Sequence, residues 1–218
     1  MAESNIFFQL YNWLVPTSSK ALDTIQAKPT EVKHGATFAK PLGVSPTYSP
    51  ETAMSAFAGH GYVYAAVSRA SQDLAALPLK LLKGKDRVQI KSHPVIDLMN
   101  NPNSNTDAFL FREQLCVDLM MCGSNFILML GTGEKPTSLV RLHPQNVKIV
   151  TDQTGVAGYI YESGGQRVRY SKDRIIHGRL ASWSNGPQQL YGTGAVEPLA
   201  RELQADINSQ NLVSNASA

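Results

Sequence analysis

The sequence predicts an α+β fold in which helices pack on short antiparallel strands. Apolar residues recur at helical intervals between residues 62 and 122, whereas residues 124–177 hold short β-rich runs separated by turns that contain Gly or Asp. The strands follow one another instead of alternating with helices, which argues against a parallel sheet built from βαβ units. With 218 residues, of which 43% are hydrophobic, the chain can bury one ordinary core. We therefore expect one globular domain with an appended arm.

Residues 1–54 are predicted to form a flexible N-terminal arm. The apolar run Ile6–Val15 is followed by a stretch rich in Pro, Thr, Ser and Lys that has no sustained apolar period. The run is too short to span a bilayer, has no basic flank and is not followed by a cleavage site. We therefore expect a soluble, non-secreted protein with no membrane partner. One helical face of the run can dock on a partner or on the chain's own domain, and the sequence favours neither.

The folded domain is expected over residues 55–191, and its first half is predicted to be helical around one hairpin. Apolar residues at intervals of four and three predict a helix that begins near Tyr62 and ends before Pro78. These residues are Val63, Val67, Ala70, Leu74 and Leu77. The turn Gly84-Lys85-Asp86 between two alternating runs indicates a β-hairpin over residues 79–91.

Two further helices are predicted from their capping residues. Ser92 before His93-Pro94 predicts a short helix that reaches about Asn100. Thr106 caps a second helix that reaches Cys122, and Gly123 stands where a left-handed C-terminal glycine belongs.

The second half of the domain is predicted to consist of antiparallel hairpins. The expected strands are Phe126–Leu130, Leu139–Leu142, Val147–Val150, Tyr159–Glu162, Arg167–Tyr170 and Ile175–His177. After Tyr191-Gly192-Thr193-Gly194, an apolar stripe predicts the start of a long helix over residues 192–218, and we expect this stripe to be exposed. The stripe comprises Val196, Leu199, Leu203 and Ile207.

No set of residues in the sequence predicts catalysis, a cofactor or a bound metal. The Gly-rich segment Gly131–Thr137 lacks the spacing of a phosphate-binding loop and is interpreted as a hairpin turn. The histidines show neither helical pairing nor a His-Glu-x-x-His motif; they are His34, His60, His93, His143 and His177.

Other candidate groups have plainer structural interpretations. Cys116 and Cys122 lie in an apolar helix, turned about 240° from one another at 3.6 residues per turn, and are interpreted as small buried residues in a reducing compartment. Asp73 and Asp118 can be buried acids, although exposed or ion-paired aspartates are commoner. The polar segment Arg179–Tyr191 can form a protein-binding loop or an ordinary surface loop.

The formal net charge of +3 and the sequence pI of about 8.8 are mildly basic. Proteins that bind nucleic acid tightly usually carry clusters of Lys and Arg, and this net charge is lower than such clusters give. Charge alone therefore does not predict DNA binding.

Four blocks of the sequence, taken in order, resemble the portal proteins of long-tailed phages of the lambdoid type. The first two are residues 63–81, with a Leu77-Pro78 exit from a helix, and residues 93–126, which contain the most distinctive motifs. Those motifs are His93-Pro94-Val95-Ile96-Asp97-Leu98-Met99, Asn101-Pro102-Asn103, Phe109, Phe111-Arg112-Glu113 and Gly123-Ser124-Asn125-Phe126. The third block is Leu142-His143-Pro144-Gln145-Asn146-Val147, and the fourth joins residues 175–179 to residues 191–199. In the fourth block Glu197 stands where the family usually has Ser, which costs a helix cap.

The resemblance implies a structural subunit and no catalytic, cofactor-binding or metal-binding residues. It implies a wing domain over residues 55–191 and the start of a stem-type helix over residues 192–218, with the clip, the rest of the stem and the crown absent. The implied assembly is a ring of this chain, commonly dodecameric, at the portal vertex of a virion assembled in the cytoplasm of a bacterial host. The implied partners are the large terminase, the major capsid or scaffold protein, a head-tail adaptor and the duplex DNA that passes through the channel during packaging and ejection. The residues that contact DNA are unknown at this stage.

Two other classes of function were weighed against the portal. An α/β hydrolase or nucleotide-dependent enzyme requires a site assembled from residues far apart in the sequence, and His143 and His177 are the residues to test. A scaffold or head-tail adaptor has the same partners as a portal but is usually smaller and lacks the ordered set of four blocks.

Overall fold

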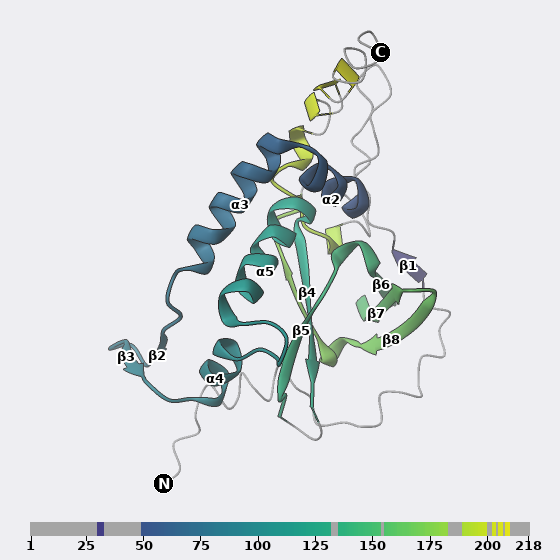
Figure 1. The fold of residues 1–218 in the computed structure, drawn as a ribbon. Helices are drawn as coiled ribbons and strands as arrows, with labels where there is room; N and C mark the ends of the chain where they lie inside the picture. The colour runs from purple at the N-terminus through teal and green to yellow at the C-terminus, as the bar shows by residue number, and fades with distance from the viewer. Residues whose placement is uncertain are drawn as a thin grey trace.

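Three antiparallel sheets and a group of helices make up the described part of the fold in the computed structural model (Figure 1). The structure describes residues 30–32, 49–131, 135–153, 155–182 and 189–199, together with positions 202, 203, 205, 206, 208 and 209. The helices are α2 (Pro50–Gly59), α3 (Gly61–Ala75), α4 (Pro94–Asn100) and α5 (Ala108–Cys122), with short 3-10 helices η1 (Pro144–Asn146), η2 (Lys172–Arg174) and η4 (Glu197–Leu199). The mixed α+β class predicted from the sequence is therefore confirmed.

The strands form three separate antiparallel sheets. A three-stranded sheet has the order β5 (Ser138–Leu142), β4 (Ser124–Leu130) and β9 (Ile175–Arg179). A four-stranded sheet has the order β1 (Thr30–Val32), β6 (Val147–Asp152), β7 (Gly155–Ser163) and β8 (Gln166–Ser171). The hairpin of β2 (Leu81–Lys83) and β3 (Val88–Ile90) stands by itself. Each strand predicted between residues 79 and 177 is thereby confirmed.

Strand β4 is buried on both faces, because it lies between α5 and the four-stranded sheet. Ile127 and Met129 pack with Phe111 and Leu115 of α5. Phe126 and Leu128, which point the opposite way, pack with residues of the second sheet and with Tyr191. This placement explains why the strand is apolar at successive positions instead of alternating with polar residues.

The other side of α5 packs on α2 and α3. Val117, Met121 and Cys122 contribute to a cluster that also contains Ala53 of α2, Val63 and Val67 of α3, and Val196 near the end of the described chain. The layers thus run from α2 and α3 through α5 and the three-stranded sheet to the four-stranded sheet, as Figure 1 shows.

Helix α2 begins at Pro50, five residues before Ser55, near which the sequence predicted that the folded domain begins. Ser49 and Thr52 form a reciprocal capping box, and Pro50 occupies the first helical turn. These groups satisfy the free backbone donors at the start of α2, so the helix starts at Pro50 and not near Ser55. Of the predicted arm, β1 pairs with β6, and the apolar run Ile6–Val15 lies outside the described residues.

Helix α3 turns a different face to the core from the predicted one. Val63 and Val67 are buried as expected, but Leu74 and Leu77 are 49% and 59% exposed. Ser71 and Ala75 are buried in their place. The buried stripe follows intervals of four, and its small side chains let α3 lie close to α5.

Two predicted caps lie one residue away from the observed ones. His93, and not Ser92, caps α4, because its Nδ1 accepts a hydrogen bond from the backbone N–H of Val95. Asp107, and not Thr106, caps α5 by accepting from the N–H of Leu110. Gly123 ends α5 in the left-handed region at φ 70°, as predicted.

The last predicted helix starts differently from the expectation. Residues 197–199 form a 3-10 turn, and the described positions from 202 to 209 are helical. Val196 is buried and Leu203 packs on the cluster of α2, α3 and α5, whereas Leu199 is 52% exposed. The expectation of a wholly exposed stripe is therefore wrong for Val196 and Leu203, and Ile207 lies outside the described residues.

Candidate functional site

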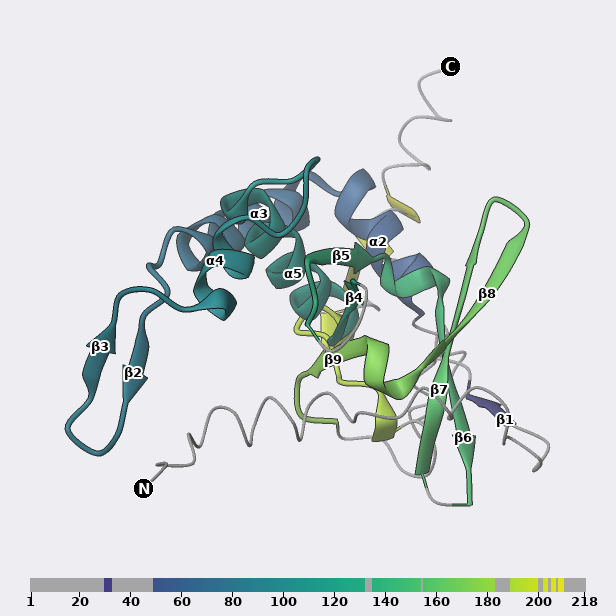
Figure 2. The ribbon, with the colours of Figure 1, turned by 90° about the horizontal axis from the view of Figure 1, so that it is seen from below.

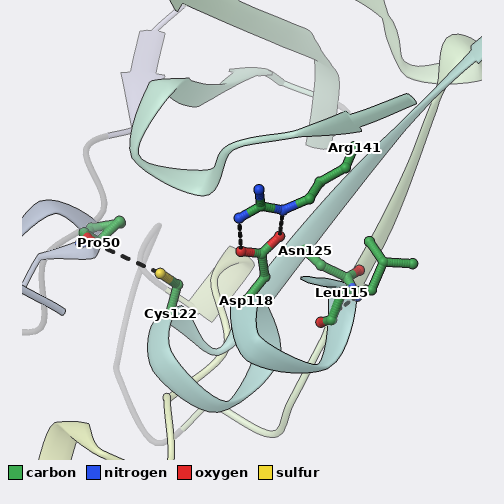
Figure 3. Close-up of polar contacts among 6 residues, drawn as sticks. All are labelled: Pro50, Leu115, Asp118, Cys122, Asn125 and Arg141. Atoms are coloured by element: carbon green, nitrogen blue, oxygen red, sulfur yellow. Dashed lines mark hydrogen bonds and ion pairs between the residues drawn. The ribbon is translucent and has the colours of Figure 1, made fainter. Parts of the chain in front are cut away.

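The most polar feature of the interior is an ion pair between α5 and β5. Asp118 is 0% exposed, and its carboxylate accepts from Nε of Arg141 at 2.6 Å and from Nη2 at 2.5 Å (Figure 3). Both oxygens of the acid are therefore occupied by one guanidinium group. This two-point contact fixes the rotation of α5 relative to the sheet.

Burial shifts the pKa of the acid and of the neighbouring thiol. Burial raises the pKa of Asp118 to about 6, against the opposing hydrogen bonds and charge of Arg141. Burial, with the Asp118 carboxylate adding to it, also raises the pKa of the Cys122 thiol, whose Sγ lies 4.0 Å from the carbonyl oxygen of Pro50. Burial likewise raises the pKa of Cys116. Both cysteines are free thiols in surroundings that disfavour a nucleophilic thiolate.

A second polar contact in Figure 3 connects β4 with α5. Nδ2 of the buried Asn125 donates to the carbonyl oxygen of Leu115 at 3.2 Å. The contact gives the buried side-chain amide of Asn125 a hydrogen-bond acceptor, so Asn125 serves packing here.

The segment Tyr191–Gly194 crosses the corner between α5 and β4 at very short range. A Cβ added to Gly192 would lie 2.0 Å from the carbonyl oxygen of Gly123, and one added to Gly194 would lie 2.3 Å from that of Met121. The N–H of Gly192 donates to Oγ of Ser124 at 3.0 Å. The two glycines are thus required by the close approach of two backbone segments.

Residues on either side of these glycines tie the crossing segment to the fold. The hydroxyl of Tyr191 accepts from the N–H of Ile149 at 3.0 Å, which links the segment to the four-stranded sheet. The carboxylate of Glu197 accepts from the N–H of Gly194 at 3.2 Å, and burial raises the pKa of this acid. Glu197 therefore bonds back to the crossing segment three residues earlier, inside the turn that it begins.

The histidines considered as catalytic candidates are dispersed. Nε2 of His60 lies 2.7 Å from Oδ2 of Asp206, and His93 caps α4. The ring of His177 stacks on Phe126 with centroids 4.4 Å apart. The pKa of the half-buried His143 is lowered by burial and by the charge of Arg141. His34 lies outside the described residues.

The described residues contain no group of three or more His, Cys, Asp or Glu side chains that could hold a metal ion. Asp73 forms an exposed ion pair with Arg69 one helical turn away, at 3.1 Å. Asp118 is the buried acid among the candidates, and its partner is Arg141. Sequence reasoning missed that partner, although a single Arg inside the apolar strand Ser138–Leu142 was the available signal.

The two candidate loops are only partly described. Residues 131 and 135–137 connect the antiparallel strands β4 and β5, and the N–H of Thr137 donates to the carbonyl oxygen of Leu130 at 2.8 Å. The hairpin interpretation of Gly131–Thr137 is confirmed. In the other loop Arg179 donates to the carbonyl oxygen of Gln189 at 2.7 Å, and residues 183–188 lie outside the described part.

A cavity of about 350 Å³ opens between the start of α5 and the β4–β5 hairpin. Its lining mixes polar and apolar side chains and contains neither a carboxylate nor an imidazole among the described residues: Asn103, Ser104, Asn105, Thr106, Phe111, Gln114, Leu130, Ser138, Val140 and Arg141. Arg141 is already bound to Asp118. The cavity therefore offers no acid–base pair for catalysis.

No helix within the described residues is both long enough and apolar enough to cross a membrane.

The fold is similar to that of chains in three solved structures of gene transfer agent (GTA) particles. The chain is similar to the neck of an empty GTA particle computed with C6 symmetry, with a TM-score of 0.66 and 23% identity over 79% of this chain and 48% of that chain. It is similar to a chain in the virion of a native gene transfer agent (GTA) particle, with a TM-score of 0.62 and 21% identity over 76% and 45% of the two chains. A third similar structure is the neck of a native GTA particle computed with C12 symmetry, with a TM-score of 0.60 and 20% identity over 78% and 47%.

Comparison of sequences identifies the family. An uncharacterized protein of Rickettsia bellii (strain RML369-C) is 26% identical over 155 residues, which cover 68% of this chain and 39% of that protein. The chain therefore spans less than half the length of this curated relative and of the similar solved chains. The family described as phage portal protein matches residues 62–217, which contain α3, α5, both larger sheets except β1, and the crossing segment. The chain belongs to the phage portal protein family.

Proposed function

We propose that the chain is a structural subunit of the portal ring at the capsid vertex. In that role it forms part of the channel for DNA packaging and ejection and part of the platform on which the tail joins the head. The observation that carries the proposal is the family match over residues 62–217. The printed descriptions of the similar solved structures, a virion and particle necks computed with C6 and C12 symmetry, support a ring inside a particle.

We further propose the division of the chain and its place of action. Residues 55–191, extended to the helix that starts at Pro50, form the wing domain, residues 1–49 form an arm, and residues 192–218 begin a stem-type helix. The subunit assembles in the cytoplasm of a bacterial host and resides in the virion. Its partners are further copies of itself, the large terminase, capsid or scaffold protein, a head-tail adaptor and duplex DNA.

The described geometry supports a role without bond chemistry. Asp118, the buried acid of the ion pair, is held by Arg141, and both cysteines have raised pKa values that disfavour nucleophilic attack. No observation favours the hydrolase or nucleotide-dependent alternative. A channel wall that does not grip phosphates also suits a polymer that must slide through it.

The proposal is tested in cells that produce the particle. Deletion of the gene should yield heads that contain no DNA, measured as nuclease-protected DNA per particle, and an intact copy supplied in trans should restore packaging. An epitope fused to the encoded protein should label a single vertex of each particle in electron micrographs. Packaging that is unchanged by the deletion, or label spread over the shell, would show that the chain is not a portal subunit.

A further inference from the structure

The cavity between the start of α5 and the β4–β5 hairpin is a feature that the proposed portal role leaves unused. Its volume of about 350 Å³ lies at the lower end of the range for small-molecule sites. Figure 2 shows α5 lying beside β4 and β5, whose side chains form two of the cavity's walls. Residues 103–106, which lead into α5, form a third wall. A ligand in the cavity therefore meets side chains of a helix, a hairpin and a loop of one chain.

The loop wall of the cavity is fixed to β5 by hydrogen bonds. The carbonyl oxygen of Pro102 accepts from the N–H of Leu139 at 2.7 Å and from Oγ of Ser138 at 3.0 Å. Nδ2 of Asn103 donates to the carbonyl oxygen of Leu139 at 2.8 Å. These bonds hold the wall in place without a ligand, which lowers the cost of ordering the site when a ligand binds.

Arg141 gives the cavity a cationic group that still has unused donors. Its Nε and Nη2 bind the Asp118 carboxylate, and Figure 3 shows the third guanidinium nitrogen, Nη1, pointing away from that acid. A guanidinium carries five N–H groups, and two of them donate to Asp118. The side chain is 19% exposed and lines the cavity. The edge of Arg141 that does not contact Asp118 is therefore free to donate to a second acceptor.

Neutral hydrogen-bonding side chains share the cavity with Arg141. Within the described part of the chain, neither the hydroxyl of Thr106 nor the side-chain amide of Gln114 has a hydrogen-bond partner. The side chain of Asn105 accepts from Oγ of Ser104 at 3.3 Å, which leaves its amide nitrogen as a donor. The cavity therefore combines one cation with several neutral donors.

The charge of the site favours a carboxylate over a phosphate. Arg141 is the cation among the described lining residues, and Asp118 already balances its charge. A phosphate dianion would meet no second Lys or Arg among those residues, whereas a carboxylate has a single charge and two oxygens that match a guanidinium edge. The apolar part of the lining suits the carbon chain that bears the carboxylate; it consists of Phe111, Leu130 and Val140. The ligand class is therefore a carboxylate on a short aliphatic chain.

We propose that this cavity binds a carboxylate group, which Arg141 and Gln114 hold by hydrogen bonds. The guanidinium then bridges two carboxylates, the buried Asp118 and the ligand, and the two compete for its charge. The inference goes beyond the portal role, because the site lies within one chain and needs no ring. Particles that package DNA without this chain would overturn the portal role and leave the site standing.

Nitrogen–proton correlation NMR spectra of the full chain test the site with propionate as the probe. Sodium propionate replaces sodium chloride at constant ionic strength and about pH 7.5, where Asp118 is ionised because its pKa is about 6. The Nε–H signal of Arg141 and the side-chain amide signals of Gln114 should shift together and saturate, with a Kd on the order of 1–10 mM for so small a ligand. Propionamide, which has a similar shape but no charge, should cause no saturable shift.

Three variants separate binding in the cavity from general effects of the salt. Gln114→Leu should weaken propionate binding at least fivefold, whereas Gln72→Leu, the same change at an exposed position of α3, should leave the Kd unchanged. Asp118→Asn should tighten binding at least fivefold, because it removes the competing carboxylate. Circular dichroism checks that each variant keeps the fold. Equal Kd values in all four proteins, or no saturable shift in the original chain, would overturn the site.

A blocked tripeptide, acetyl-Ala-Glu-Ala-amide, distinguishes two sources of the carboxylate. If the tripeptide binds at least tenfold more tightly than propionate, and its Gln counterpart does not bind, the site takes an acidic side chain of another polypeptide. If propionate binds and the tripeptide does not, the site takes a free short-chain acid. Both results support a carboxylate site, and the absence of binding by either probe would overturn it.

Discussion

At the scale of single residues, the pair of Asp118 and Arg141 connects the helix layer to the sheet through two hydrogen bonds to a fully buried carboxylate. Loss of one partner leaves an uncompensated buried charge. We expect Arg141→Met to lower the free energy of unfolding by about 3–5 kcal/mol. The double variant Asp118→Leu/Arg141→Met should recover most of this loss, because no charge is then buried. Urea denaturation of the four proteins in the cycle measures both effects, and additive losses would contradict the pairing.

The pKa of Asp118 gives the same pair a pH dependence. The group's pKa rises from 3.8 to about 6 on folding because burial disfavours the carboxylate, so the folded state binds the proton more tightly than the unfolded state. The contribution of this group to stability is therefore full below pH 4 and falls as the pH rises toward 6, above which it is constant. At about 1.4 kcal/mol per pKa unit, the change amounts to roughly 3 kcal/mol.

The variant Asp118→Asn isolates this pH dependence. The difference in unfolding free energy between the original chain and the variant should decrease between pH 4 and pH 6, measured by urea denaturation at fixed ionic strength. A difference that increases over this interval would show that attraction to Arg141 outweighs burial.

Gly192 is a residue whose side chain is excluded by a neighbouring backbone. A methyl group there would meet the carbonyl oxygen of Gly123, which cannot move without displacing the end of α5. We expect Gly192→Ala to destabilise the chain by about 3 kcal/mol, with roughly 2–4 °C lost in Tm for each kcal/mol. Gly59→Ala is the matched control, because nothing lies within 4 Å of the added methyl group. Equal melting temperatures for the two variants would contradict the tight crossing.

At the scale of elements, the sequence predicts which helices and strands exist more securely than it predicts their faces and ends. Alternation and turn residues predicted β5 to β9. Strands β4–β5 and β6–β7–β8 pair in sequence order, whereas β9 pairs with the distant β4. The buried face of α3 was mispredicted because the sequence analysis expected the large apolar residues Leu74 and Leu77 to be buried. Close packing on α5 instead buries the small residues Ser71 and Ala75. The start of α2 was not predicted because Ser49-Pro50-Glu51-Thr52 resembles the end of the preceding Pro-rich stretch. The sequence alone does not show that Ser49 and Thr52 cap a helix.

The polar centre was only half predictable for a similar reason. Asp118 is noticeable in an apolar helix, but the partner 23 residues away follows from the packing of α5 on β5 and not from spacing. Tyr191-Gly192-Thr193-Gly194 was recognisable as a family motif. The reason for its glycines, close contact with the backbone of Gly123, follows only from the structure.

The final turn offers a prediction about an element. Val196 is buried among α2, α3 and α5, whereas Leu199 is exposed three residues later. Val196→Asp should therefore destabilise the chain by about 3 kcal/mol or more, since it buries an unpaired carboxylate, and Leu199→Asp should change stability by less than about 0.5 kcal/mol. Thermal denaturation compares the two. Similar losses for both would show that the segment after Gly194 packs on the domain differently.

At the scale of the whole molecule, the charge distribution matters more than the net charge. A formal net charge of +3 gives little attraction for duplex DNA. Nonspecific binding should then be weak, with a Kd on the order of 10⁻⁵ M or weaker at 0.15 M salt, and a shallow dependence on salt that reflects few phosphate contacts. Fluorescence anisotropy with a labelled 30-base-pair duplex between 0.05 and 0.2 M salt measures both quantities. Submicromolar binding that survives 0.2 M salt would mean that the described surface grips DNA, which a channel wall for a sliding duplex should not do.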